Sequence, residues 1–269
     1  MLLSSRNKLT VVVMPDTLTV SLRKRGWRSP VQELGSLSVK PDDASPNWGA
    51  VVSALGQWLA QSKWAATDAE LIISDAFTRY VFLPWSDGFQ KKSEAITLAR
   101  IHFDVLFGEG HSEAKLSWHF DTHGKDGIAC SIPEGLFEAL SSVLAGHKIR
   151  LISVVPRFVH TFNTWRKRIA GNGLIVSVER DLCVMGIVRD NAWRTIRTVK
   201  LSGDMTLALL AAIDREIVLQ GESEQTRVYL DLHAVIDPSV FSQMEKFHLL
   251  GRGLQGQHGR KMEIAGATA

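Results

Sequence analysis

Few residues in this chain combine the types and the spacing that chemistry requires. His119, Asp121 and His123 alternate, so on a strand all three would face one side, where they could bind a metal ion. The same residues stand where a strand enters a polar turn, which explains them without a ligand. Residues 251–256 match the Gly-x-Gly-x-x-Gly pattern of dinucleotide sites, but such a site also needs a preceding strand and a long following helix. Because only a short low-complexity stretch follows, we interpret this match as chance.

The sequence offers no nucleophile with a base beside it. Cys130 and Cys183 each lie in an apolar, strand-like segment, and we predict two buried, reduced thiols. Neither a Cys-x-x-Cys pair nor a Gly-x-Ser-x-Gly turn occurs. Glu134 and Glu138 lie at i and i+4 on a predicted helix, which is the usual pattern of a solvated face. We therefore predict no catalytic residue and no metal ligand.

The composition excludes several functional classes. The chain has 269 residues and a net charge of +3, which is too small to indicate a nucleic-acid partner. Its first residues lack the apolar core of a signal peptide, and no apolar run is long enough to span a membrane. We therefore expect a cytoplasmic protein without direct membrane insertion, which leaves a membrane-embedded partner open.

A pattern of three strands occurs twice in the chain. Residues 174–199 divide into three apolar or alternating segments separated by short polar clusters, as expected for two consecutive hairpins. Residues 9–27 follow the same pattern. A helical pattern and a short apolar strand come after each copy, so we predict a duplicated β-β-β-α-β unit. The aligned pairs are Leu9 with Leu174, Asp16 with Asp181, and Leu22 with Ile187.

The segment between the two copies has its own order of elements. Its apolar periodicity predicts β-α-β-β-α-β, which is the order of a ferredoxin-like module. The predicted strands are 80–84, 114–120, 127–132 and 149–155, and the predicted helices are 91–107 and 133–144.

This organisation resembles the actin-like ATPase superfamily, whose α/β fold is ribonuclease H-like. Residues 71–85 carry much of the resemblance, because a strand ends in Ser, an Arg-Tyr pair follows, and a second apolar strand ends in Pro. Residues 153–156, followed by Phe158 and Trp165, are also similar. Within the superfamily the sequence resembles the pilus assembly protein PilM and the cytoplasmic domain of the type II secretion protein GspL. The implied divisions are 1–75 as the first part of lobe one, 76–155 as an inserted ferredoxin-like subdomain, 156–172 as a connecting helix, 173–250 as lobe two, and 251–269 as a disordered tail.

The resemblance implies a nucleotide site whose turns have degenerated here. Active members bind phosphate with two hairpin turns of Asp-x-Gly type, since Gly lets backbone N–H groups approach the phosphate. The turn at 14–17 has no Gly, and Pro15 removes an N–H donor. The turn at 179–182 also has no Gly, and the strand at 228–230 lacks the Gly-Gly end expected beside adenosine. We therefore expect no cofactor; the degenerate turn residues are Asp16, Thr17, Glu179 and Asp181.

The resemblance thus favours a non-catalytic cytoplasmic scaffold of a type IV pilus or type II secretion-like inner-membrane assembly. Such a scaffold would bind the cytoplasmic segment of an inner-membrane pilus or secretion protein and would lie at the inner face of the membrane through that partner; homo-oligomers stay open. The alternative is an ATP-binding actin-like protein with atypical phosphate turns, in which Asp16 and Asp181 coordinate magnesium. An unrelated enzyme with a site assembled from distant residues is a third reading.

A partner-binding surface is predicted on the insertion. Basic residues there could form a rim for an acidic or amphipathic peptide, and two aromatic residues could form its floor. The alternative interpretation is an ordinary solvated surface without a partner. The candidates are Arg79, Lys91, Lys92 and Arg100 for the rim, and Trp85 and Phe89 for the floor.

Overall fold

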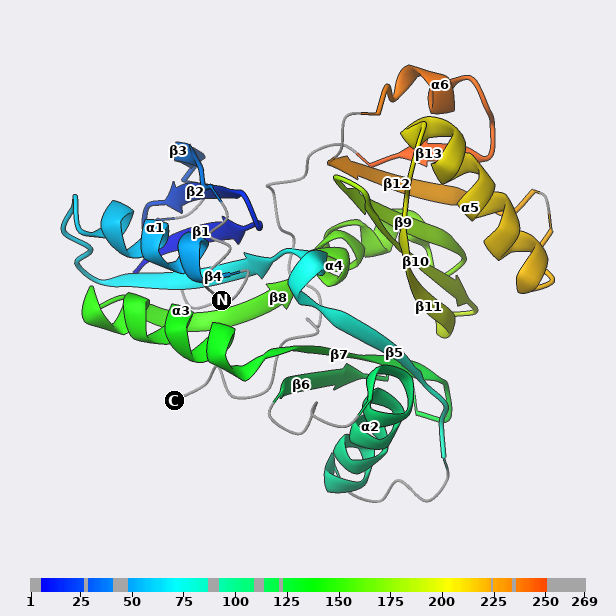
Figure 1. Cartoon of the computed structure of the whole chain (residues 1–269), viewed down its shortest axis with the longest axis horizontal. Coiled ribbons are helices and arrows are strands. Elements are labelled where there is room, and N and C mark those ends of the chain that lie inside the picture. Colours follow the sequence, from blue (N-terminus) through cyan, green and yellow to red (C-terminus); the bar gives the residue numbers. More distant parts are fainter. Residues whose placement is uncertain are drawn as a thin grey trace.

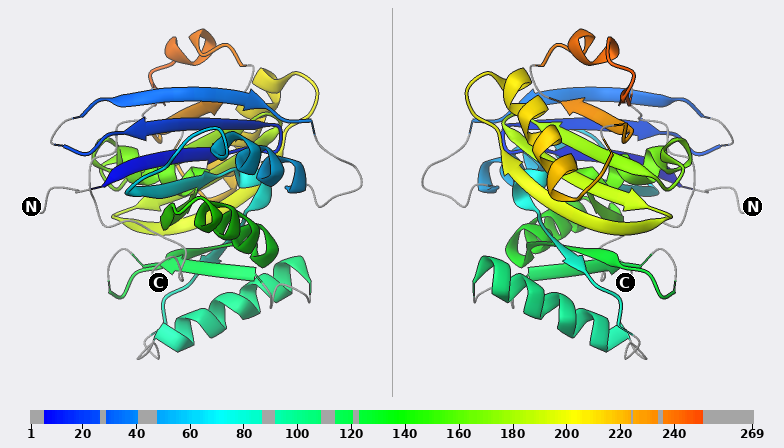
Figure 2. Two further views of the ribbon diagram at one scale, coloured as in Figure 1. Left: turned by 90° about the vertical axis from the view of Figure 1, so that its left-hand side faces the viewer. Right: turned by 90° about the vertical axis from the view of Figure 1, so that its right-hand side faces the viewer.

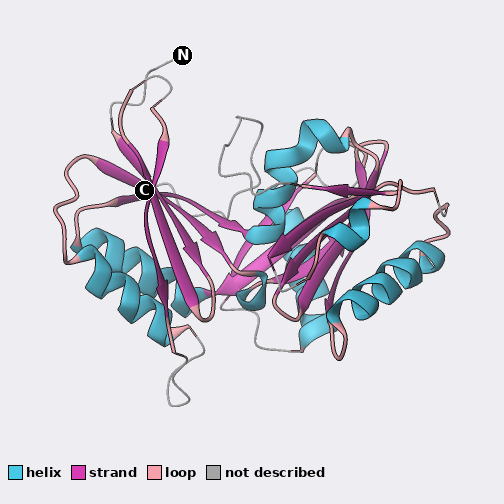
Figure 3. Cartoon of the chain, turned by 90° about the horizontal axis from the view of Figure 1, so that it is seen from above, coloured by secondary structure: helices cyan, strands magenta, loops and turns pink. Residues whose placement is uncertain are grey.

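Three β-sheets organise the part of the chain that the structure describes. This computed structural model describes residues 6–26, 29–40, 48–86, 92–108, 114–120, 123–223, 225–233 and 236–250. Two five-stranded sheets stand beside each other, with helices packed against both (Figures 1 and 3). A three-stranded sheet and one long helix lie below them in both side views (Figure 2).

The first sheet has the order β3-β2-β1-β4-β8, with β1, β2 and β3 antiparallel and β4 and β8 parallel to β1. Every residue of β4 is buried, which is what a parallel strand covered on both faces requires. The strands are β1 Asn7–Val13, β2 Thr17–Arg23, β3 Val31–Ser38, β4 Thr67–Ile73 and β8 Arg150–Pro156.

The second sheet repeats this arrangement in the order β11-β10-β9-β12-β13. The register repeats as well, because Leu9 pairs with Leu22 in the first sheet and Leu174 pairs with Ile187 in the second. The predicted alignment of the two copies is therefore confirmed. The strands are β9 Gly173–Glu179, β10 Leu182–Arg189, β11 Ala192–Lys200, β12 Val228–His233 and β13 Phe247–Leu249.

The turn between β10 and β11 shows how the sequence sets this register. Asp190 and Asn191 have φ angles of 52° and 59°, which are the left-handed values that the tight hairpin needs. The backbone N–H of Asp190 donates to Oδ1 of Asn172, and that of Asn191 donates to the carbonyl of Gly171. Asp and Asn suit these two positions because their side chains tolerate positive φ angles.

Helices α1 (Gly49–Leu59) and α3 (Glu134–Gly146) cover one face of the first sheet, and we call this assembly the first lobe (Figure 1). The helical spacing of apolar residues in the sequence continues from Trp48 to Trp64, but the helix ends at Leu59. Trp64 instead folds back, so that its ring stacks on Trp58 at 5.3 Å and its Nε1 donates to the carbonyl of Leu59. This hydrogen bond satisfies one of the carbonyls that a helix end leaves open.

Helix α5 (Met205–Leu219) covers the outer face of the second sheet, and together with the short α6 (Ser239–Ser242) it completes the second lobe. Helix α4 (Arg157–Ile169) lies between the lobes (Figure 1). Its apolar side packs on the inner face of the second sheet, where Phe158 and Phe162 contact the buried ring of Trp193. The second sheet is therefore covered on both faces.

The insertion comprises β5 (Arg79–Leu83), α2 (Lys92–Phe107), β6 (Ala114–His119) and β7 (Gly127–Pro133), and its sheet has the order β5-β7-β6. The sequence predicted β8 as its fourth strand, and that pairing is wrong: β8 hydrogen-bonds to β4 in the first sheet. The reason is packing, because α3, which precedes β8, buries Leu136, Leu140 and Leu144 against α1. Strand pairing therefore does not follow the predicted subdomain boundary at residue 155.

No helix among the described residues is long and apolar enough to cross a membrane.

Gly186 on β10 tests the packing between α4 and the second sheet. A Cβ atom at this position would lie 2.7 Å from Cζ3 of Trp193 and 2.8 Å from Cζ of Phe158, which is too close for either ring. We expect Gly186→Ala to lower the free energy of unfolding by about 1–3 kcal/mol, measured by urea denaturation. Gly146→Ala is the control, since its Cβ would meet nothing within 4 Å; an equal loss there would contradict the packing argument.

Candidate functional site

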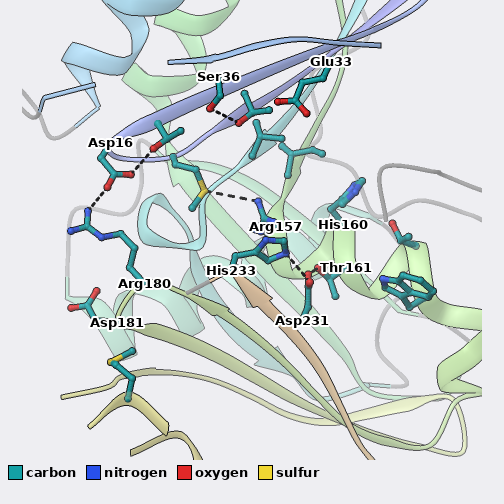
Figure 4. Close-up of a pocket in the computed structure, with 18 residues that line it drawn as sticks. Asp16, Glu33, Ser36, Arg157, His160, Thr161, Arg180, Asp181, Asp231 and His233 are labelled. Atoms are coloured by element: carbon teal, nitrogen blue, oxygen red, sulfur yellow. Dashed lines mark hydrogen bonds and ion pairs between the residues drawn. The ribbon is translucent and has the colours of Figure 1, made fainter. Parts of the chain in front are cut away.

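The two degenerate turns face each other across the space between the lobes (Figure 4). Nη1 of Arg180, in the β9–β10 turn, lies 2.9 Å from Oδ2 of Asp16, in the β1–β2 turn. Oδ1 of Asp16 accepts a second hydrogen bond from the hydroxyl of Thr17 at 3.2 Å. The acid that would position a metal-bound water is thus occupied by an arginine of the opposite lobe.

The second turn is a tight hairpin in which Arg180 has a φ of 51°. Asp181 is about half exposed at the edge of this turn, and its carboxylate lies 3.3 Å from Nζ of Lys200. Both aspartates that were weighed as magnesium ligands therefore have a cationic side chain of this chain as partner. Among the described residues, no group of three or more His, Cys, Asp or Glu side chains could hold a metal ion.

A cleft of about 850 Å³ opens between these turns and α4. One wall comes from β1, β2, β3 and β4, and the other comes from α4, the β9–β10 turn and the end of β12 (Figure 4). Helix α4 presents one stripe to it at i, i+3, i+4, i+7 and i+8, as residues on one helical face must be spaced. The stripe is Arg157, His160, Thr161, Thr164 and Trp165.

Glu179 ends β9 but does not line the cleft as a phosphate-turn residue would. Its side chain is only 3% exposed, and Oε2 accepts from the hydroxyl of Ser74 at 2.5 Å and from the backbone N–H of Asp75 at 3.0 Å. Oε1 lies 3.3 Å from Nε of Arg157, without the geometry of a hydrogen bond, so this contact is electrostatic. Burial raises the pKa of Glu179, and Arg157 and the two hydrogen bonds counteract that effect in part.

Asp75 begins the single turn η1 (Asp75–Phe77) that follows β4, and its side chain is buried beside Glu179. Its carboxylate accepts from the hydroxyl of Tyr80 and, at 3.1 Å, from the backbone N–H of Phe158. The second hydrogen bond caps the first turn of α4. Burial and the nearby Glu179 carboxylate hold the pKa of Asp75 well above its usual range. This cluster joins the first lobe, the insertion, α4 and the second lobe.

At the end of β12, Asp231 links the second lobe to the cleft. Its Oδ1 lies 2.7 Å from Nε2 of His233, and its Oδ2 accepts from the hydroxyl of Thr161 on α4. Burial raises the pKa of Asp231, but the hydrogen bonds from His233 and Thr161 outweigh it, so the pKa lies below its usual value. Asp231 therefore remains a negative charge on the cleft wall at neutral pH.

The residues present do not fit a magnesium nucleotide. Pro15 removes a phosphate-binding N–H, Arg180 bridges the two turns, and Glu179 is committed to Ser74 and Asp75. The structure therefore brings the two predicted turns together, but their acids have other partners: Asp16 pairs with Arg180, Glu179 accepts from Ser74 and Asp75, and Asp181 lies beside Lys200.

The predicted partner-binding residues on the insertion are only partly described. Arg79 is exposed on β5, where its guanidinium donates to the carbonyl of Thr78. Trp85 is half-buried, and its ring packs on Phe120 and His123 at 5.3 and 4.7 Å. Phe89, Lys91 and the side chain of Lys92 lie outside the described residues, as do Asp121 and residues 251–256. A rim formed by these residues stays a prediction.

Cys130 and Cys183 are free and buried, as predicted. Burial raises the pKa of each thiol to about 12, so neither forms a thiolate at neutral pH.

The pH dependence of stability tests the Asp75 cluster. Because Asp75 holds its proton to a higher pH in the folded state than in the unfolded chain, stability falls as pH rises above about 3.9. We expect Asp75→Asn to remove this loss, so that the variant gains stability relative to the wild type between about pH 4 and pH 7, measured by urea denaturation.

Asp68→Asn is the matched control for that experiment. Burial raises the pKa of Asp68, but Arg150 and Arg6 lower it by more, so this carboxylate contributes stability above its unfolded pKa and loses it as pH falls. The control variant should therefore be less stable than the wild type by a nearly constant amount above about pH 4, and this deficit should shrink as pH falls below that value. Parallel curves for wild type and Asp75→Asn would contradict the raised pKa.

Comparison with known proteins identifies the fold. No protein-family model and no curated protein sequence matches this chain. Among solved structures, the chain is similar to a Bacteroides thetaiotaomicron protein with an actin-like ATPase fold and unknown function, with a TM-score of 0.61, 10% identity, and coverage of 92% of this chain and 91% of that one.

Two further structures are similar over most of their length. The cytoplasmic domain of EpsL, an inner-membrane component of the type II secretion system of Vibrio cholerae, has a TM-score of 0.57 and 12% identity over 91% of this chain and 90% of that one. A chain of a PilM–PilN type IV pilus biogenesis complex has a TM-score of 0.57 and 13% identity over 83% of this chain and 80% of that one. The predicted resemblance is confirmed at the level of the fold: the chain has the actin-like ATPase fold.

Proposed function

We propose that this protein is a non-catalytic scaffold of an inner-membrane assembly of the type II secretion or type IV pilus kind. It binds a cytoplasmic segment of a membrane partner and reaches the inner face of the membrane through that partner. Two of the structures that share its fold are an inner-membrane secretion component and a pilus biogenesis complex, which supports this class of role.

One observation carries the non-catalytic part of the proposal. The ion pair between Arg180 and Asp16 joins the two turns between which the phosphates of a nucleotide would lie. An incoming triphosphate would have to break that pair and would meet Pro15 where a backbone donor is needed. Asp181, the exposed acid of the second turn, likewise has a cationic neighbour of this chain, Nζ of Lys200 at 3.3 Å.

The alternative function is nucleotide binding through atypical turns. The observation that favours it is the cleft of about 850 Å³, which falls within the size range of small-molecule sites. Asp16 and Asp181 would then have to exchange their cationic partners for magnesium.

Thermal unfolding with and without millimolar magnesium-ATP separates the two functions. A ligand at about a hundred times its dissociation constant stabilises the native state by ~2.7 kcal/mol, which raises the Tm by several degrees for a chain of this size. We expect no rise. A rise that disappears in an Asp16→Asn, Asp181→Asn variant would contradict the scaffold proposal and establish the alternative.

Charge reversal on the insertion tests the predicted partner surface. We expect Lys91→Glu with Lys92→Glu to reduce the membrane proteins that co-purify with the tagged protein from a detergent extract, measured by quantitative mass spectrometry. Lys63→Glu, in the exposed loop after α1, is the control. If the wild type, the double variant and the control recover the same amounts of membrane proteins, the basic rim is not the partner-binding surface.

A further inference from the structure

The cleft between the lobes has a charge opposite to that of the whole chain. Its lining contains the carboxylates of Asp16, Glu33, Asp181 and Asp231 but the guanidinium groups of only Arg157 and Arg180. Carboxylates in the lining thus outnumber guanidinium groups by four to two, whereas the chain carries a net charge of +3. Fixed charge in a cleft raises the local concentration of ligands of the opposite sign.

The carboxylates differ in how far they are compensated. Asp16 is paired with Arg180, and Asp231 is hydrogen-bonded to His233. Glu33 on β3 is exposed and makes no ion pair with any other described residue. Asp181 is about half exposed and has only the exposed Lys200 nearby, at 3.3 Å.

These two carboxylates lie on opposite walls. Figure 4 shows Glu33 on the first lobe and Asp181 on the turn of the second lobe, with the space of the cleft between them. A charged residue on an outer strand often serves only to discourage strand pairing between molecules. Glu33 differs because it lines the cleft, together with Ser36 of the same strand.

We infer that the cleft binds a short, extended, lysine- or arginine-bearing segment of the membrane partner. The inference rests on the proposed function and adds where the partner's segment binds and which charge that segment carries. Cytoplasmic segments next to membrane-spanning helices carry an excess of Lys and Arg, so such a segment has the charge that complements this cleft.

The remaining lining suits an extended peptide. Hydroxyl groups of Thr17, Thr19, Ser36 and Thr164 line the cleft. Thr17 donates to Asp16, and Thr19 and Ser36 share one hydrogen bond at 3.3 Å, so their remaining lone pairs can accept from the N–H groups of a peptide backbone. Trp165 also lines the cleft, but the guanidinium of Arg168 lies over its ring at 5.7 Å, so a cationic side chain of the ligand would have to displace Arg168 from that face. The apolar Val12, Met14 and Ile72 can pack against the aliphatic stem of a lysine.

Fluorescence anisotropy with two labelled peptides tests the inference. The probes are fluorescein-labelled pentalysine and pentaglutamate, each titrated with the full chain at low ionic strength. We expect pentalysine to bind, pentaglutamate not to bind, and Glu33→Gln with Asp181→Asn to weaken pentalysine binding roughly two- to fivefold, the range for exposed charge pairs.

The matched control removes two negative charges elsewhere. Glu138 on α3 and Glu245 before β13 are both exposed and do not line the cleft. Glu138→Gln with Glu245→Gln should therefore leave pentalysine affinity unchanged. A benzophenone group on the peptide should cross-link to β3, α4 or the β9–β10 turn, as identified by mass spectrometry.

Each contrary outcome overturns the inference. If the cleft double variant and the control double variant weaken pentalysine binding equally, the net charge of the protein alone attracts the peptide. If the cross-links are confined to the insertion, the peptide binds at the predicted basic rim and not in the cleft. Binding of pentaglutamate in place of pentalysine would reverse the charge of the ligand. These results would contradict the inference about the cleft but not the scaffold proposal. Stabilisation of the native state by magnesium-ATP would contradict the scaffold proposal itself.

Discussion

The arrangement of the two lobes depends on one buried carboxylate. Glu179 leaves the second sheet and accepts hydrogen bonds from Ser74 and from the backbone of Asp75, at the end of a strand of the first sheet. Arg157 supplies the compensating charge at 3.3 Å. Removing one partner of such a buried set is costly because the others lose their only compensation. Glu179, which the sequence predicted as part of a phosphate turn, is thus a structural link between the two sheets.

The turn that carries this link also shapes the cleft. With Glu179 turned inward, Arg180 is the side chain of the turn that reaches across to Asp16. A nucleotide-hydrolysing site needs open backbone donors and free acids at these two turns. Here both turns are engaged with each other, so the cleft that remains is shaped by side chains of α4 and β3 instead.

The sequence was most informative where structure follows local periodicity. The correspondence of Leu9 with Leu174 and of Leu22 with Ile187 was predictable because alternation and turn residues fix hairpin register within a few residues. The pairing of β8 with β4 was not, since parallel pairing joins distant segments and depends on where α3 finds its apolar partner. The cleft was missed for a similar reason. The stripe from Arg157 to Trp165 has the spacing of one helical face, but Glu33 and Asp231 join it only through the tertiary fold.

The apolar cluster around α4 has a consequence for how the chain can be divided. Tyr80, Ile128 and Cys130 of the insertion pack with Phe158 of α4 and with Trp193 of the second lobe in one core. A fragment that stops before β9 would expose the apolar side of α4 and one face of the inserted sheet, and a fragment that starts at β9 would expose the inner face of the second sheet. Exposed apolar surfaces of this kind favour association over solubility. The duplicated lobes, although each has its own sheet, are therefore joined through one shared apolar core rather than through a linker.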